Sequence, residues 1–104
     1  MDIEVMLEQN GHRVIGSATS VPAALRLLDT LTPDVAVLDV NLRGQSVAPV
    51  AERLREISVP FVLASAYDFR NIDSSDVLKG AVNIGKPIRE RRLLDALTAV
   101  IAAG

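Results

Sequence analysis

The sequence contains no cysteine, which excludes disulfide bonds, a thiol nucleophile and a cysteine-ligated metal. Aromatic residues make up only 3% of the chain, so leucine, valine, isoleucine and alanine must fill the interior. No stretch reaches the roughly 18 apolar residues that a membrane helix needs. Neither a Gly-x-Gly-x-x-Gly motif nor a Walker-type loop occurs, which argues against a nucleotide-dependent enzyme.

Basic residues are not concentrated on any predicted face, and the formal net charge is -2. The densest basic group is Arg89, Arg91 and Arg92, and Glu90 among them favours a solvated first turn of a helix. We therefore expect no nucleic-acid binding. The N-terminus is acidic and lacks the basic and apolar regions of a signal peptide, so we expect a cytoplasmic protein without membrane association.

Apolar residues account for 49% of the 104 residues, which is enough for one core and too little chain for two. We therefore predict a single domain over residues 1–104. Helical spacing of apolar residues, capping residues and turn residues predict the helices. They cover 2–10, 21–31 after a cap at Ser20, 47–57 and a weak helix at 74–79. A last helix carries Leu93, Leu94, Leu97, Val100 and Ile101.

Short apolar runs predict strands at 13–16, 35–40, 61–64 and 81–84. The run 35–40 is apolar at successive positions until Asp39, so side chains on both faces of the strand are apolar. This pattern predicts a strand buried on both faces. Strands that alternate with helices favour parallel pairing and right-handed crossovers. The expected fold class is therefore α/β, with a flavodoxin-like doubly wound parallel sheet.

Three chemically distinct side chains follow three successive predicted strands. Asp39 ends the run 35–40, Ser65 follows 61–64, and Lys86 follows 81–84. The carboxyl ends of parallel strands meet at one edge of the sheet, so these side chains are expected to converge. A carboxylate can attack phosphorus, while a lysine and a hydroxyl can hold phosphoryl oxygens. Phosphoryl transfer depends mainly on such positioning and charge compensation.

These motifs resemble the receiver domains of two-component response regulators. Residues 33–44 (PDVAVLDVNLRG) look like the phosphoacceptor strand and loop, and 86–88 (KPI) are similar to the family's Lys-Pro-Phe element. Residues 61–67 (FVLASAY) resemble a subclass with a Phe-Ala-Thr-Gly-x-Tyr type motif, and 11–16 (GHRVIG) the entry to the second strand. The resemblance extends over nearly the whole chain.

The resemblance implies roles for the matching residues. Asp39 would be the phosphoacceptor and, with the backbone carbonyl of Asn41, a ligand of Mg²⁺. Ser65 and Lys86 would bind the phosphoryl group and act in the switch, with a cis peptide bond placing the lysine before Pro87. A histidine kinase or phosphotransfer protein would supply the phosphate, and a downstream protein would respond to it; no enzymatic activity is implied.

Tyr67 stands where this subclass carries its signature tyrosine, and it would be associated with the switch. Asn83 stands where many receivers have an aromatic residue on the last strand, which counts against that particular switch mechanism.

The chain departs from the family at its N-terminus. Receivers begin with a strand and an acidic pair that holds Mg²⁺, and in their strand order 2-1-3-4-5 that first strand is central. Residue 1 aligns inside the first helix, so we expect a chain truncated relative to the family, with weak or lost Mg²⁺ binding. Two sheet edges would then lack a partner strand.

Other interpretations of the same residues stay open. Asp39 is also consistent with a helix cap or with a buried, hydrogen-bonded carboxylate. Ser65 is consistent with a plain turn residue, Lys86 with a surface lysine, and Tyr67 with a packed loop aromatic. The main functional alternative is a degenerate receiver that binds partners without phosphorylation. An aspartyl-phosphate hydrolase is less favoured, because Asn41 stands where such enzymes have a second aspartate. A homodimer through Val100, Ile101 and Ala102 is a further prediction.

Overall fold

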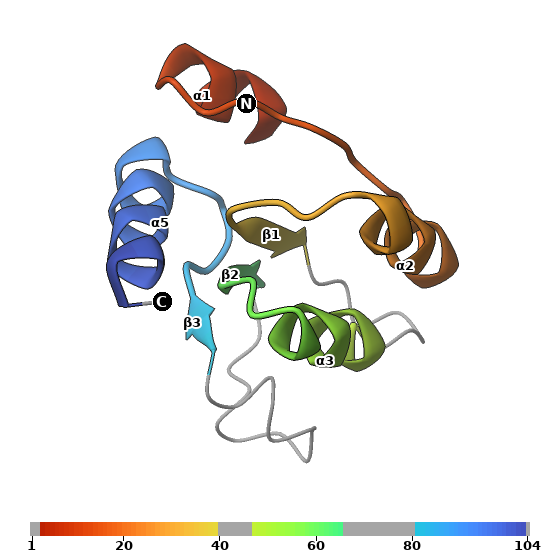
Figure 1. Cartoon of the computed structure of the whole chain (residues 1–104). Helices are drawn as coiled ribbons and strands as arrows, with labels where there is room; N and C mark the ends of the chain where they lie inside the picture. Colours follow the sequence, from red (N-terminus) through yellow and green to blue (C-terminus); the bar gives the residue numbers. More distant parts are fainter. Residues whose placement is uncertain (1–2, 40–46, 66–80, 104) are drawn as a thin grey trace.

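The structure of the chain, a computed structural model, describes residues 3–39, 47–65 and 81–103. Within these ranges, helices and strands alternate through most of the chain (Figure 1). The elements are α1 (Ile3–Gln9), α2 (Val21–Thr30), β1 (Ala36–Asp39), α3 (Ala48–Glu56), β2 (Phe61–Ala64), β3 (Val82–Asn83) and α5 (Glu90–Ala103). The predicted helix at 74–79 lies outside the described residues.

The three strands form one parallel sheet in the order β1-β2-β3. β1 pairs with β2 along its whole length, from Ala36 opposite Phe61 to Asp39 opposite Ala64. β2 pairs with the shorter β3 through Leu63 opposite Asn83. The parallel pairing and the connecting helices confirm the predicted α/β class with a flavodoxin-like arrangement.

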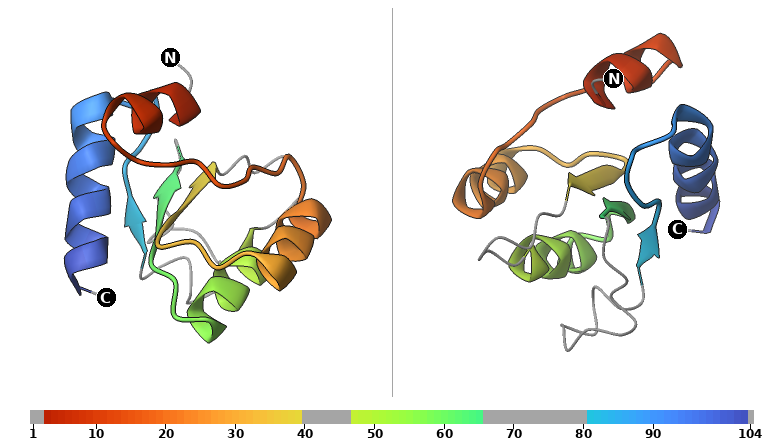
Figure 2. Two further views of the ribbon diagram at one scale, coloured as in Figure 1. Left: turned by 45° about the horizontal axis from the view of Figure 1, so that its top comes forward. Right: turned by 180° about the vertical axis from the view of Figure 1, so that it is seen from behind.

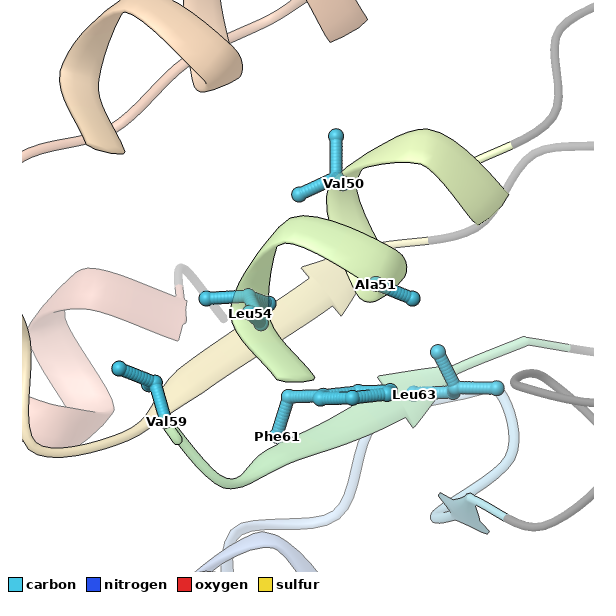
Figure 3. Packing of buried hydrophobic residues seen from close by; sticks show 6 residues of the cluster. All are labelled: Val50, Ala51, Leu54, Val59, Phe61 and Leu63. Atoms are coloured by element: carbon cyan, nitrogen blue, oxygen red, sulfur yellow. The ribbon is translucent and has the colours of Figure 1, made fainter. Parts of the chain in front are cut away.

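Helices cover both faces of this sheet, as Figure 2 shows from two further directions. On one face, buried residues of α3 form a core with Val59, Phe61 and Leu63 (Figure 3). Partly buried residues of α2 pack against this core. On the other face, Met6 of α1 and Leu93 and Leu97 of α5 pack against the intervening residues of β2. The middle strand therefore contributes to both halves of the core, and its four residues are all buried.

Local sequence explains where the helices begin and end. The hydroxyl of Ser20 accepts a hydrogen bond from the backbone N–H of Ala23, which is the N-cap predicted for α2. After α1, the N–H of His12 donates to the carbonyl of Leu7, and Gly11 has the positive φ of a helix-ending C′ residue. α3 ends with the same pattern, in which Val59 donates to Leu54 and Ser58 has φ 59°.

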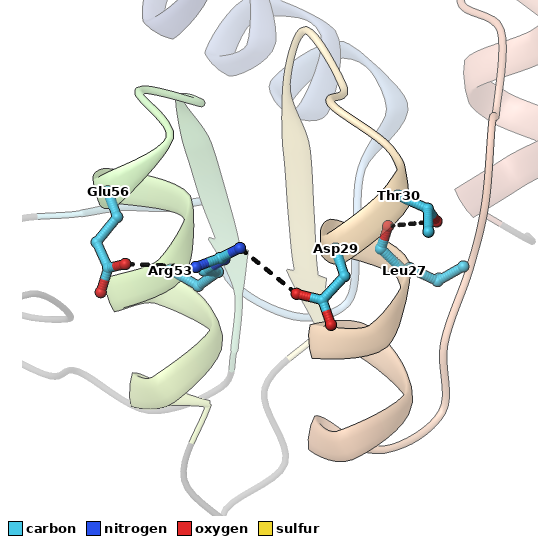
Figure 4. A network of polar contacts seen from close by, with 5 residues as sticks. All are labelled: Leu27, Asp29, Thr30, Arg53 and Glu56. Carbon is cyan, nitrogen blue, oxygen red and sulfur yellow. Dashed lines mark hydrogen bonds and ion pairs between the residues drawn. The ribbon is translucent and has the colours of Figure 1, made fainter.

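An exposed ion pair joins α2 to α3 on the outside of the sheet. The guanidinium of Arg53 lies 3.4 Å from Asp29 on α2 and 3.5 Å from Glu56 one turn further along α3 (Figure 4). Four apolar side chains of α2 pack against the core and are only partly buried: Val21, Ala24, Leu25 and Leu28.

Two predictions about the strands are wrong. Residues 13–16 form no strand; they belong to the segment that connects α1 to α2, and Gly16 lies against Leu27 and Leu31. A strand needs a neighbour for its backbone groups. Among the described strands, β1 pairs with β2 on one side, and none pairs with its outer edge. For the same reason β1 is half-buried with an exposed end, and not buried on both faces as predicted.

Candidate functional site

The carboxyl edge of the sheet brings together two of the predicted site residues. Asp39 is the last residue of β1, and Lys86 follows β3 on the far side of β2. The Lys86 Nζ lies 2.5 Å from the Asp39 Oδ1, although the two residues are separated by more than forty positions in the sequence. The Asp39 side chain is 60% exposed and that of Lys86 34%, so the carboxylate remains open to a reactant from solvent.

Ser65 lies at the same edge but in a different environment. It follows β2 directly and is only 1% exposed, the one polar residue among the buried side chains of the described residues. Its place after β2 puts it at the predicted edge of the sheet. Its burial differs from the open carboxylate of Asp39 and from a solvated turn residue.

The turn between β3 and α5 positions Lys86. Gly85 has φ +77°, a conformation that favours glycine, and the next peptide bond, Lys86–Pro87, is cis. The resemblance to receivers predicted this cis bond, and the structure confirms it. The turn directs Lys86 back across the sheet edge to Asp39.

Beside Lys86 there is an open hollow of about 320 Å³ with a basic lining. It is formed by Ile84, Gly85, Lys86, Pro87, Arg89 and Arg92. Arg92 is exposed in the first turn of α5, as predicted, and its guanidinium also donates to the backbone carbonyl of Asn83. Among the described residues, three cationic side chains and no carboxylate line this hollow, so it favours the approach of an anion.

Asn83 is the residue that the sequence prediction undervalued. Its side-chain oxygen accepts hydrogen bonds from the backbone N–H of Ser65 at 3.1 Å and of Gly85 at 2.9 Å. The sequence held a signal for one of these, since asparagine is depleted in strands and commonly accepts from the N–H two residues on. The bond to Ser65 joins residues 18 positions apart, so it could be found only from the folded structure.

The described residues do not form a magnesium site by themselves. They include no group of three His, Cys, Asp or Glu side chains placed to hold a metal ion, and Asp39 is the one site carboxylate they supply. Mg²⁺ prefers six oxygen ligands, and one carboxylate leaves the others to water or to a substrate phosphate. The predicted ligand Asn41 and the predicted switch residue Tyr67 lie outside the described residues.

Comparison with known proteins places this geometry in context. No family model matches the chain. A curated relative, the positive alginate biosynthesis regulatory protein of Pseudomonas aeruginosa, is 35% identical over 92 residues. The match includes 85% of this chain but 36% of that protein, so the chain spans about a third of the length of its relative.

Solved structures match the chain over almost its full length. The signal receiver domain of a modulated diguanylate cyclase from Desulfovibrio desulfuricans G20 aligns with 97% of the chain and 82% of its own, at a TM-score of 0.81 and 23% identity. The BeF₃-activated SdrG of Pseudomonas melonis Fr1 aligns with 95% and 83%, at a TM-score of 0.74 and 31% identity. The chain therefore has the fold of response-regulator receiver domains.

Proposed function

We propose that this chain, which has the receiver-domain fold, accepts a phosphoryl group on Asp39 and thereby changes a surface that binds a partner. The observation that carries the proposal is the contact between the Lys86 ammonium and the open carboxylate of Asp39 at the carboxyl edge of the sheet. The likeness to a signal receiver domain and to a BeF₃-activated protein supports it.

The chemistry follows from the two charged groups. A carboxylate oxygen of Asp39 attacks the phosphorus of the donor, and the bond from phosphorus to the leaving group breaks with its electron pair. The donor would be the phosphohistidine of a kinase or phosphotransfer protein, whose imidazole leaves and takes up a proton. Lys86, already on one carboxylate oxygen, is placed to pair with the oxygens of the transferred group.

Lys86, Arg89 and Arg92 give the donor an electrostatic route to the site, because they line the hollow beside it. Magnesium enters the proposal only as a weakly held ion, with Asp39, water and, by the resemblance, the carbonyl of Asn41 as ligands. We expect phosphorylation to depend on Mg²⁺ at high concentration, since one described carboxylate gives little affinity.

The direct test is the intact mass of the protein after incubation with acetyl phosphate and Mg²⁺. We expect a gain of one phosphoryl group that is lost at alkaline pH, as acyl phosphates are. Asp39→Asn removes the nucleophile and should abolish the gain. Asp34→Asn is the matched control, because Asp34 is exposed just before the opposite end of β1. Equal labelling of the Asp39→Asn variant would contradict the proposal.

The alternative is a receiver fold that binds its partner without phosphorylation. The small number of acidic ligands among the described residues favours it. No mass gain at any Mg²⁺ concentration, together with partner binding that Asp39→Asn leaves unchanged, would support this alternative. A hydrolase would instead release phosphate from an ester in repeated turnovers that depend on Asp39.

Two further expectations belong to the proposal. No helix among the described residues is long and apolar enough to cross a membrane, and we propose a cytoplasmic location.

We also propose a homodimer through the end of α5, where Ile101 is exposed and Val100 is partly buried. A molecular mass in solution that stays monomeric at all concentrations would contradict the dimer.

A further inference from the structure

We propose that Asn83 is a positioning residue that holds Ser65 and the Lys86 turn in one arrangement through a single oxygen atom. The inference rests on the proposed function, because the two segments that Asn83 joins are those that carry Ser65 and Lys86. It goes beyond that function in assigning a role to a residue that bears no reactive group.

The first step of the argument is where the strand pairing stops. The last ladder bond between β2 and β3 runs from the N–H of Ile84 to the carbonyl of Leu63, at 2.8 Å. If the parallel ladder continued by one step, the N–H of Ser65 would donate to the carbonyl of Ile84. It donates instead to the Asn83 Oδ1 at 3.1 Å, so a side chain takes over the pairing where the turn begins.

The second step is that the same oxygen also holds the turn. The N–H of Gly85 donates to the Asn83 Oδ1 at 2.9 Å, and Gly85 precedes Lys86 directly. Both partners are N–H donors, so the carbonyl oxygen of the amide, and not its nitrogen, must face them. One acceptor therefore joins the segment that carries the buried hydroxyl to the segment that carries the ammonium.

The third step is that Asn83 is itself anchored. Its position on β3 is paired with Leu63, and its backbone carbonyl accepts from the guanidinium of Arg92 on α5 at 3.3 Å. Because the asparagine is fixed from both sides, its side chain can fix other groups. Reacting groups displaced by about 1 Å can lose on the order of a hundredfold in rate, so loss of this link should reach the chemistry.

Two substitutions separate the oxygen from the size of the side chain. Asn83→Leu keeps a similar volume and branching but has no acceptor, whereas Asn83→Asp keeps an acceptor for both N–H groups. We expect Asn83→Leu to slow phosphorylation by acetyl phosphate at least about tenfold and Asn83→Asp to restore most of the rate. Val59→Ala, at a buried position before β2 that does not line the hollow, is the control for a general loss of stability.

Amide signals give a measurement that does not require phosphorylation. In ¹H–¹⁵N spectra, the Ser65 and Gly85 amide protons should shift upfield and exchange faster in Asn83→Leu. They should keep their hydrogen bonds in Asn83→Asp and Val59→Ala. Unchanged amide signals in Asn83→Leu would overturn the inference, whatever the phosphorylation result. If no variant and no wild-type protein gains a phosphoryl group, the proposed function fails, and these amides still decide the geometry.

The rate measurements provide the second decision. Slower phosphorylation in Asn83→Leu with rescue in Asn83→Asp, while Val59→Ala reacts as the wild type does, would support positioning by the oxygen. The inference would be wrong if Val59→Ala lost as much rate as Asn83→Leu, or if Asn83→Asp gave no rescue.

Discussion

β1 and β2 are neighbouring strands of four residues, paired in register, yet their surroundings differ completely. All four residues of β2 are buried, whereas β1 has three half-buried residues and ends in the exposed Asp39. The two sequences, AVLD and FVLA, are almost equally apolar. The difference comes from their neighbours, since among the described strands β2 has one on each side and β1 has one in all.

The same division extends to the helices. α3 buries Val50, Ala51 and Leu54, and α5 buries Leu93 and Leu97, and both helices pack on β2. By contrast, α2 has no fully buried residue although its apolar stripe faces the core. Stability should therefore be concentrated around β2, and substitutions on the β1 side should cost less. The shallower packing of β1 also leaves the Asp39 carboxylate accessible.

The largest effect is expected from truncating leucines at paired positions of the two strands. Leu38 of β1 lies opposite Leu63 of β2, and both pack on the α3 side of the sheet. We expect Leu63→Ala to lower the free energy of unfolding by about 3–4 kcal/mol and Leu38→Ala by about half as much, because a half-buried side chain leaves a smaller cavity.

Denaturant unfolding of the two variants beside the wild type measures this difference. If the Leu63→Ala variant does not fold, Leu63→Val and Leu38→Val give a milder form of the same comparison. Equal losses at the two positions would show that the β1 side is as well packed as β2, contrary to the structure.

The strands also show what the sequence could and could not predict. Phe61–Ala64 was predicted to the residue, and Ser20 as the cap of α2, because these features depend on local pattern. The strand at 13–16 was wrong, and so was the full burial of β1, because a strand's pairing and burial depend on which segments lie beside it.

The candidate site divides in the same way. The contact between Asp39 and Lys86 follows from a rule of topology, that the carboxyl ends of parallel strands share an edge, and it could be predicted. The link from Asn83 to Ser65 depends on where the ladder between β2 and β3 stops, which no spacing in the sequence discloses. The chemical roles of Asp39, Ser65 and Lys86 stay predictions.

Two glycines with positive φ allow a second comparison, between a helix end and the turn before Lys86. Gly11 (φ +88°) ends α1, outside the turn that carries Lys86, and Gly85 (φ +77°) precedes Lys86 directly. An added Cβ would meet no atom within 4 Å at either position. Alanine at each should therefore destabilise the protein by about 1–2 kcal/mol through backbone strain alone. Only Gly85→Ala should also slow phosphorylation. A similar slowing in Gly11→Ala would show that stability, and not the turn, controls the rate.

A smaller effect, of opposite sign, is expected where α3 leads into β2. Ser58 has φ 59° in a helix end with the same hydrogen bonds as the one that contains Gly11. Ser58→Gly removes the backbone strain that the Cβ causes, which should raise the free energy of unfolding by about 0.5–1 kcal/mol. The greater flexibility of the unfolded chain with glycine offsets part of this gain. Thermal unfolding would measure it, with Ser58→Ala as the control that retains the strain. A lower melting temperature for glycine than for alanine would contradict this account.

The smallest effect is expected on the outer face of the β1 side. Arg53 and Asp29 lie 3.4 Å apart with side chains 38% and 66% exposed, and Arg53 has a second partner in Glu56. Such exposed pairs contribute about 0.2–1 kcal/mol and are screened by salt, so Asp29→Asn should change stability by no more than a few tenths of a kcal/mol. Leu28→Ala, one position earlier on α2, should cost more, because partial apolar burial holds this helix to α3. Unfolding at low and at high salt separates the two contributions. A larger loss of unfolding free energy in Asp29→Asn than in Leu28→Ala, which disappears at high salt, would show that the ion pair holds α2. The β1 side would then differ from the β2 side in the kind of interaction that stabilises it as well as in the depth of its packing.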